Sequence, residues 1–577
     1  MTPQLATAVL TILRTSLVLR AIPRAGGVLA RTWRGEPTSI SRRARRGALV
    51  LLALLILSLD SGRVSAQERA LPDPEDRSGG GGATGATEPV TFTLLQLNDN
   101  YEIAPLQNGT VGGLARVATV RQELLRENPR TYTLLSGDFF SPSAIGTAAV
   151  GGTPLAGRQM VDVLNTLGLD YATFGNHEFD LEPGPFRQRL AESRFHWVSS
   201  NVTDANHAPF QAGDPPREIP RRRTFDVENG RGAKVRVGLI AVTLDANKKD
   251  YVRYADPIAT AREQVDALLC QDHARVILAL THLTLGQDKE LARKVPKIDL
   301  ILGGHEHNNS TSIVGDADRP PIFKADANAA TVYIHRLSYD TETDTLRVDS
   351  SLRALTASTP EDPTVAGRVR DWMEKGFQGF RAAGFDPPRV VARTEIPLDG
   401  REAIVCNSAT DLTKLIGRAM QAQVAAAGHG TPEVALYNSG MIRIDDILQP
   451  GPITEYDVIR ILPFGGTIWS VAVPGDLLQK TLDTGITQAL KTPSAKIIQA
   501  VGATPDPQGV WRIGAAPLDP HRTYQVALND YVLNKSEDLK KLKDGGSRVG
   551  ELRHAVITYL GGLPDDVLRK EEGPDTR

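Results

Sequence analysis

Two hydrophobic patterns alternate along the chain after residue 90. Short apolar runs rich in β-branched residues predict strands, and segments with an apolar residue every three or four positions predict amphipathic helices. The predicted helices include 113–127 and 155–167, and the predicted strands are 91–97, 132–135, 171–174, 235–242, 275–280 and 298–302. Strands that alternate with helices indicate βαβ units, and therefore a layered α/β domain over residues 90–355.

A second, smaller α/β domain is predicted over residues 390–565. It opens with a strand at 390–396 and a long helix at 409–426. A helix over 364–383, closed by Gly384 and the sequence Asp386-Pro387-Pro388, forms a connector within residues 356–389. Residues 566–577 form a charged tail.

The first 66 residues have the pattern of a targeting segment. Arg42, Arg43, Arg45 and Arg46 precede the apolar run 47–57, and small residues at 64–66 offer a cleavage site. The run is short for a bilayer span, so we expect export to the periplasm or exterior with no membrane span after signal cleavage; an uncleaved anchor is the alternative. Sec and twin-arginine export both stay open. Residues 67–89 form a flexible Gly-rich linker.

Length, charge and cysteine count exclude several classes of protein. The 577 residues are too many for one ordinary core. The formal charge is -2, but residues 1–66 hold ten arginines and only two acidic residues, so the rest of the chain has a net charge of about -10. This negative charge excludes nonspecific binding to nucleic acid. Cys270 and Cys406 are too few for a Cys-based zinc site, and we expect two free thiols.

Metal-ligand residue types cluster just beyond predicted strand ends. Because the carboxyl ends of strands in an open α/β sheet face one crevice, the clusters are expected to converge. Carboxylates and imidazoles together suit two divalent transition ions about 4 Å apart. A lone Asp or His of this kind is more often a cap or a core residue, but five segments in succession favour a metal centre. The segments are Asp99, Gly137-Asp138, Gly175-Asn176-His177-Glu178, Thr281-His282 and Gly303-Gly304-His305-Glu306-His307.

This order of motifs resembles the calcineurin-like metallophosphoesterases. Together with Asn438-Ser-Gly-Met-Ile-Arg443 and Leu462-Pro-Phe-Gly-Gly466, it resembles the two-domain 5'-nucleotidase family, bacterial UDP-sugar hydrolases included. The resemblance covers residues 90–560. It implies a layered metallophosphoesterase sandwich followed by a substrate-binding domain, and two divalent ions such as Zn, Mn or Fe.

The resemblance also implies roles for site residues. One ion takes Asp99, Asp138 and His307, and the other takes Asp138, Asn176, His282 and His305. His177 approaches the phosphate as a cation or proton donor, Asp180 orients its ring, and a metal-bound hydroxide is the nucleophile. In the second domain, Asn438, Gly440 and Arg443 hold substrate while Phe464 and Tyr531 stack on a base. Taken alone, either aromatic residue is more often a core residue.

The chain departs from the family pattern in three places. The family usually has Asp-x-His where this chain has Asp99-Asn100-Tyr101; Tyr101 either supplies a phenolate ligand or packs beside a site with one ligand fewer, and we favour packing because an unperturbed Tyr has a pKa near 10. Lys535-Ser536-Glu537-Asp538 replaces a Gly-rich turn. Residues 405–408 lack the Arg that often binds phosphate in the family; Arg401 is a nearby candidate to replace it, but no motif in the sequence indicates that role.

The resemblance therefore predicts a metal-dependent phosphoric ester hydrolase that acts on a small phosphate ester, nucleoside 5'-monophosphates first of all. A 2',3'-cyclic nucleotide phosphodiesterase, a UDP-sugar hydrolase and a thiosulfate-ester hydrolase are close alternatives. A catalytically impaired binding protein of the same fold is a further one. Metal identity, base preference and oligomeric state stay open.

Overall fold

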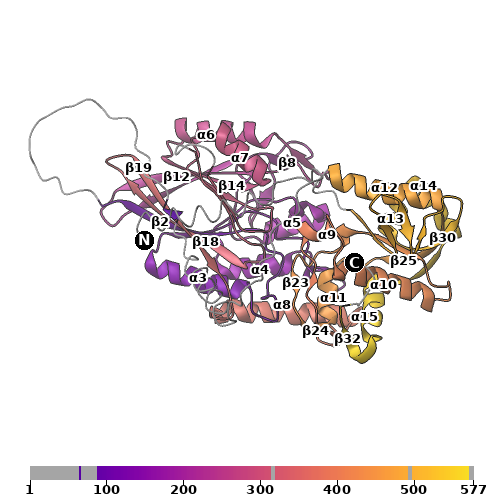
Figure 1. Ribbon diagram of the computed structural model, residues 1–577. Helices are drawn as coiled ribbons and strands as arrows, with labels where there is room; N and C mark the ends of the chain where they lie inside the picture. Colours follow the sequence, from indigo (N-terminus) through magenta and orange to yellow (C-terminus); the bar gives the residue numbers. More distant parts are fainter. Residues whose placement is uncertain (1–63, 66–87, 314–318, 492–496, 571–577) are drawn as a thin grey trace, which may run out of the picture. The chain divides into compact units, whose positions relative to one another are not determined.

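The computed structural model describes residues 64–65, 88–313, 319–491 and 497–570, without the side chains of 486–491 (Figure 1). All of these residues belong to one compact unit, 63–577. The predicted targeting segment and linker lie almost entirely outside the described residues, as does the end of the tail. In the described ranges, no helix combines the length and apolar character that crossing a bilayer requires.

Two sheets form the first half of the chain. One has the strand order β1-β19-β18-β2-β3-β6-β7 and the other β11-β12-β14-β15-β17-β16. The first sheet comprises β1 Val64–Ser65, β19 Thr345–Ala354, β18 Thr331–Asp340, β2 Val90–Leu97, β3 Thr131–Leu135, β6 Tyr171–Ala172 and β7 His196–Trp197. The second comprises β11 Arg222–Glu228, β12 Lys234–Thr243, β14 Val276–His282, β15 Leu300–Gly303, β17 Ile322–Lys324 and β16 Ser310–Ser312.

The sheets pack face to face, and helices cover their outer faces. Phe92 and Leu134 of the first sheet share a buried apolar cluster with Leu278 of the second. The outer face of the first sheet packs on α3 Leu114–Glu127, α4 Arg158–Leu167 and α8 Pro363–Ala382. The outer face of the second packs on α6 Pro257–Cys270 and α7 Leu285–Lys294. This four-layer arrangement confirms the predicted layered α/β fold.

Parallel pairing brings the carboxyl ends of the central strands together. Strands β2, β3 and β6 run parallel in one sheet, as do β12, β14 and β15 in the other. In the second sheet, Thr281 is in register with Gly303, which places His282 beside Gly304. Consecutive parallel strands therefore deliver their following loops to one edge.

Some predicted boundaries differ from the structure by a few residues. The helix predicted from residue 155 begins at Arg158, because Gly157 adopts a left-handed conformation with φ 84°. The strand predicted to reach Phe174 ends at Ala172. His282 is the last residue of β14 rather than the first beyond it.

The second half is built on a five-stranded sheet, in the order β26-β22-β30-β25-β31. Helix α10 Asp411–Ala426 packs on one face, and α12 Gly475–Lys491, α13 Asp530–Lys535 and α14 Glu537–Lys541 pack on the other. The strands are β26 Ile498–Val501, β22 Val434–Asn438, β30 Thr523–Asn529, β25 Thr467–Pro474 and β31 Ser547–Glu551. This sheet with its helices confirms a second α/β region.

Smaller elements complete the second half. A three-stranded sheet, β24-β20-β32, packs near α11 Glu455–Ile461 and α15 Leu552–Gly561. Its strands are β24 Gly451–Thr454, β20 Val390–Thr394 and β32 Val567–Leu568, and the short helix α9 Glu402–Val405 follows the strand β21 Leu398–Asp399.

Candidate active site

The predicted metal ligands lie at the carboxyl ends of the central strands of both sheets. Asp99 follows β2 and Asp138 follows β3, while His282 ends β14. The loop after β15 carries His305 and His307. Residues more than 200 positions apart, such as Asp99 and His305, are therefore directly bonded: the His305 N–H donates to Asp99 Oδ2 at 2.8 Å.

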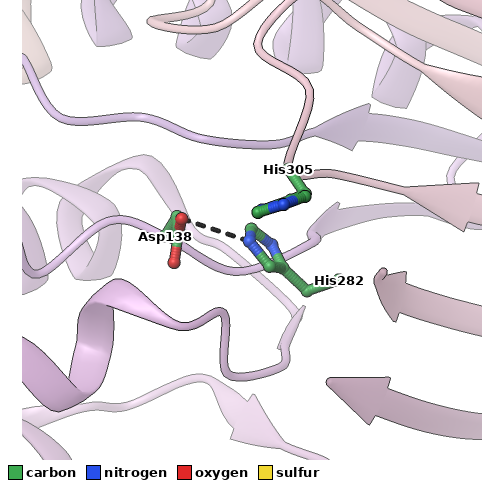
Figure 2. Close-up of side chains that lie close together, drawn as sticks. All are labelled: Asp138, His282 and His305. Carbon is green, nitrogen blue, oxygen red and sulfur yellow. Dashed lines mark ion pairs between the residues drawn. The ribbon is translucent and has the colours of Figure 1, made fainter. Parts of the chain in front are cut away.

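The ligand atoms form two groups that share Asp138. Asp138, His282 and His305 each offer one atom within 4.8 Å of the others, and so do Asp99, Asp138 and His307. Figure 2 shows the first group, with His282 Nε2 3.1 Å from Asp138 Oδ2. In the second group, His307 Nε2 lies 3.4 Å from Asp99 Oδ1. The first group holds three of the four residues of one expected ligand set, without Asn176, and the second group holds all three residues of the other set.

Buried atoms without a hydrogen-bond partner indicate that these residues fit a metal centre. Among the described residues, Asp99 Oδ1, Asn176 Oδ1 and His282 Nε2 are buried and accept or donate no hydrogen bond. Such atoms are rare in folded proteins because an unsatisfied buried polar group is costly. Divalent cations coordinated by these atoms would satisfy them, so the site suits transition-metal ions held by O and N ligands.

The backbone at the ligands is strained. Asp99, Asp138, His305 and His307 have φ values of 50°, 58°, 89° and 59°, which non-glycine residues seldom adopt. Strain of this kind persists only where the surroundings enforce it, and it is concentrated at functional sites.

Close backbone approach explains the glycines Gly137 and Gly175 in the loops after β3 and β6. A Cβ on Gly175 would lie 2.1 Å from Asp138 Oδ1, and one on Gly137 would lie 2.4 Å from the backbone nitrogen of Gly175. Only glycine lets the loops after β3 and β6 come this close together.

Glu178 holds the loop that carries Asp138. Its carboxylate accepts hydrogen bonds from the backbone N–H groups of Asp138 at 2.9 Å, Phe139 at 2.7 Å, Phe140 at 3.0 Å and Gly175 at 2.6 Å. Glu178 is therefore a structural anchor for the metal loop. Glu178 belongs to the predicted motif Gly175-Asn176-His177-Glu178, but it was not predicted as a site residue.

The electrostatics keep both carboxylates ionised. Burial raises the pKa of Asp138, but the charges of His282 and His177 outweigh burial and hold it far below the ordinary value. Burial also raises the pKa of Asp99, but His282 and His307 outweigh burial and lower the pKa below its ordinary value. Ionised carboxylates are the form that binds a divalent cation.

The histidines respond to the same charges. Burial lowers the pKa of His282, but Asp138 and Asp99 outweigh it and raise the pKa to about 9. For His305, burial and the charge of His282 lower the pKa to about 4, so this ring is neutral and suited to ligation.

His177 and Asp180 form the predicted pair. His177 Nδ1 lies 2.7 Å from Asp180 Oδ2, while Asn247 Nδ2 donates to Asp180 Oδ1 at 2.8 Å. Burial lowers the pKa of His177, but Asp138 and Asp180 raise it above the usual value. Asn247 also donates to the backbone oxygen of Asn176 at 2.9 Å, and no motif in the sequence pointed to it.

Tyr101 lies inside the metal-ligand cluster. Its hydroxyl is 3.1 Å from Asp138 Oδ2 and 2.9 Å from His307 Nε2. Burial, followed by the charges of Asp138 and Asp99, raises the pKa of Tyr101 well above its ordinary 10. The hydroxyl of Tyr101 therefore contacts two candidate ligands, Asp138 and His307.

A buried lysine supports the loop that carries His305 and His307. Lys324 is 1 % exposed, and its Nζ donates to the backbone oxygens of Leu283 at 2.6 Å and Gly304 at 2.7 Å. It also pairs with Asp288 Oδ2 at 2.8 Å and with Glu306. The sequence carried no signal for Lys324.

The structure divides the predicted substrate residues into two groups. Arg443 is close enough to affect the pKa values of His177 and Asp180, and Asn438 is buried, where its Oδ1 accepts from Asn529 Nδ2 at 2.8 Å. Phe464 and Tyr531 are 56 % and 51 % exposed, so the alternative that they are core residues is wrong. Gly440 lies in the buried turn after β22.

Two of the departures from the family pattern have visible structural consequences. Ser536 caps α14 by accepting from the Leu539 N–H, so a helix begins where the family has a Gly-rich turn. The Arg401 guanidinium pairs with Asp399 at 2.6 Å. Arg401 is thus engaged with a neighbouring carboxylate.

A groove in the described part of the chain lies apart from this cluster. It has a volume of about 1390 Å³, and its lining includes Arg194, Arg217 and Trp372 but none of the predicted site residues.

Comparisons with known proteins match both halves of the chain. Residues 92–309 match the calcineurin-like phosphoesterase family, and residues 390–544 match the family described as 5'-nucleotidase, C-terminal domain.

Individual relatives share most of the chain. A trifunctional nucleotide phosphoesterase protein of Bacillus subtilis is 28 % identical over 84 % of this chain, which spans about a third (34 %) of that protein. A 5'-nucleotidase of Mus musculus is 24 % identical over 79 % of this chain and 83 % of its own length. The crystal structure of a 5'-nucleotidase precursor from Thermus thermophilus has the same fold, with a TM-score of 0.64 and 24 % identity over 84 % of this chain and all of that one.

The two matched families occur in the same order as the two halves of the structure, and the first contains the cluster of ligand residues. The chain therefore combines a calcineurin-like phosphoesterase domain with a 5'-nucleotidase C-terminal domain, and these two domains identify it as a metal-dependent phosphoester hydrolase.

Proposed function

We propose that this protein releases phosphate from nucleoside 5'-monophosphates with the help of two divalent ions. The observation that carries the proposal is the pair of ligand groups that share Asp138, next to the His177–Asp180 pair. Two relatives, a nucleotide phosphoesterase and a 5'-nucleotidase, support a nucleotide as substrate.

Two sets of side chains would hold the ions. Asp99, Asp138 and His307 form the first set, and Asp138, Asn176, His282 and His305 form the second. When bound, the ions supply positive charge that lowers the pKa of water and offsets the charge of the phosphate. His282 is oriented for this role, because its Nδ1 is bonded to the backbone oxygen of Ser136 at 2.7 Å and Nε2 faces the carboxylates.

His177 would contact the phosphate as a proton donor or cation. Its Nδ1 is bound to Asp180, which fixes the ring and leaves Nε2 for substrate. The raised pKa of His177 supports the protonated form near neutral pH. Asp180 acts as a positioning residue, and Asn247 and Ser141 hold its carboxylate in place.

The second half would select the substrate. Arg443 can bind phosphate or carboxylate oxygens in a bidentate manner, and Asn438 can hydrogen-bond to the substrate. Phe464 and Tyr531 are available to stack on a base because about half of each side chain is exposed. Export to the periplasm or exterior belongs to the same proposal and rests on the pattern of residues 1–66.

A related esterase activity is the second candidate. Helix α14 begins where the family has a flexible turn, close in sequence to Tyr531, and this change favours a shift in the base or sugar that is accepted. A cyclic nucleotide or a nucleotide sugar is then the preferred substrate.

A substrate panel tests the proposal. Purified full-length protein is given Mn²⁺ or Zn²⁺ together with AMP, UDP-glucose, 2',3'-cyclic AMP or a thiosulfate ester, and the products are quantified by chromatography. We expect AMP to have the highest kcat/KM. Preference for another member of the panel would select the second candidate, and no hydrolysis of any would favour a non-catalytic binding protein.

His177→Ala identifies the chemical step in the same assay. We expect kcat to fall about 100- to 10,000-fold while metal content is unchanged, because His177 contacts substrate and not the ions. His521→Ala, which removes an exposed histidine, is the matched control and should keep full activity.

A further inference from the structure

His307 is held from both sides of its ring. Its Nε2 faces the metal-ligand cluster, 3.4 Å from Asp99 Oδ1. Its Nδ1 lies 2.5 Å from Asp445 Oδ2, and Asp445 is 138 residues further along the chain, just after the Asn438–Arg443 motif. The partner of this candidate ligand therefore comes from the second half of the protein.

Asp445 is itself fixed in place. Its other carboxylate oxygen, Oδ1, accepts the backbone N–H of Glu402 at 2.7 Å, at the start of α9. Its backbone has a φ of 41°, a conformation that non-glycine residues seldom adopt. The side chains of Asp445 and His307 are only 14 % and 13 % exposed, so little water competes for the bond.

We propose that Asp445 is a positioning residue that orients His307 for cation binding, so that the second half of the chain contributes to the metal centre as well as to substrate selection. The inference rests on the proposed ligand role of His307. A histidine that ligates through Nε2 donates its Nδ1–H to an acceptor, and a carboxylate acceptor fixes the tautomer and increases the basicity of the ring. Removing such a partner typically weakens metal affinity 10- to 100-fold.

Asp446 provides a matched control on the same loop. Its Oδ1 accepts from Gln107 Nε2 at 2.8 Å, so it also connects the second half to the first. It contacts none of the candidate ligands. Loss of Asp446 therefore removes a similar contact between the halves without touching His307.

The test is a calorimetric Mn²⁺ titration of the full-length protein, stripped of metal and without substrate. We expect Asp445→Ala to lower the affinity for one equivalent of Mn²⁺ about 10- to 100-fold. Asp445→Asn should lower this affinity less, because an amide oxygen still accepts the hydrogen bond but carries no charge. The second equivalent and the affinities of Asp446→Asn should stay within about twofold of wild type. Should Asp445→Ala fail to fold, Asp445→Asn, which is nearly isosteric, decides.

Two further readouts separate positioning from a general structural role. Excess Mn²⁺ should restore turnover of Asp445→Asn, because occupancy and not chemistry is impaired. In a His307→Ala background, Asp445→Ala should have no additional effect on Mn²⁺ affinity, since the two residues act as one unit.

Wild-type affinity for both equivalents in Asp445→Ala and Asp445→Asn would overturn the inference, even if the protein hydrolyses AMP. Wild-type affinity in His307→Ala would instead overturn the ligand assignment on which it rests. Absence of AMP hydrolysis, with the expected metal affinities, would refute the proposed substrate alone.

Discussion

Asp138 contacts three other site residues through two carboxylate oxygens. Its Oδ1 accepts the backbone N–H of His177 at 2.7 Å, and its Oδ2 lies 3.1 Å from both His282 Nε2 and the Tyr101 hydroxyl. The carboxylate therefore links both candidate ligand sets to the proposed proton donor.

Tyr101 gives a prediction at the scale of one residue. We expect Tyr101→His to increase the affinity for one Mn²⁺ equivalent, because a neutral imidazole is a better ligand than a phenol that must lose its proton to ligate. Tyr101→Phe, which keeps the ring and removes the hydroxyl, is the control. A titration in which Tyr101→His gains neither affinity nor activity would contradict the packing interpretation.

The candidate ligands could be proposed from the sequence, but most of the side chains that bond to them could not. Asp99, Asp138 and His305 could be proposed because each follows a predicted strand end, and a glycine directly precedes Asp138 and His305. Lys324 and Asp445 could not, because their roles depend on which distant loops the folded chain brings together. Tyr101 was correctly placed near the site, but no pattern predicted that it would bond to two ligands.

At the scale of elements, β17 supports the loop after β15 through Lys324. We expect Lys324→Met to reduce the free energy of unfolding by about 3–5 kcal/mol, because it leaves the buried Asp288 carboxylate without its cation. Chemical denaturation measures the change. Lys297→Met is the control, since Lys297 is 62 % exposed and its pair with Asp266 should contribute less than about 1 kcal/mol. Equal, small effects in both variants would show that Lys324 is dispensable.

His335 makes β18 sensitive to acid. The ring is fully buried, bonded to Ser350 Oγ at 2.8 Å and Gln96 Oε1 at 3.0 Å, and burial lowers its pKa to about 3. Below pH 6.5 the His335 ring becomes protonated in the unfolded state but stays neutral in the folded state. The free energy of unfolding therefore falls from pH 6.5 toward pH 3, by an amount on the order of 5 kcal/mol over the full range.

Denaturation midpoints of wild type and His335→Gln between pH 7 and pH 4 test this sign. The variant should lose less stability on acidification because glutamine does not titrate. Parallel pH profiles for the two proteins would rule out His335 as the cause.

Element boundaries were predicted where local chemistry decides them. Asp362 caps α8 by accepting from the Thr364 and Val365 N–H groups, and the expected helix start is off by one residue. The strand at 171–174 was predicted too long, because the chain turns after Ala172 to deliver Asn176 and His177 to the site. That turn follows from tertiary packing rather than from local pattern.

At the scale of the whole molecule, contacts join the two halves near the site. Besides His307 and Asp445, Gln107 bonds to Asp446 at 2.8 Å, and the Tyr456 hydroxyl donates to Glu102 at 3.4 Å. If substrate enters and product leaves by a hinge motion, as we expect, these contacts must open during each turnover.

A reversible cross-link tests the hinge. With Cys270 replaced by Ser, cysteines at Gln107 and Asp446 are joined by a short cleavable cross-linker. We expect kcat to fall at least about tenfold and to recover on cleavage, because closure is then locked. Each single-cysteine variant is a control. Unchanged turnover in the fully cross-linked protein would exclude the hinge.

The most direct test of the central claim is the metal dependence of phosphate release. Metal-free protein is titrated with Mn²⁺ while AMP hydrolysis is followed. The shared Asp138 predicts no activity without metal, full activity only after two equivalents per chain, and loss of both equivalents in Asp138→Ala. Full activity in the presence of a chelator, or after a single equivalent, would contradict it.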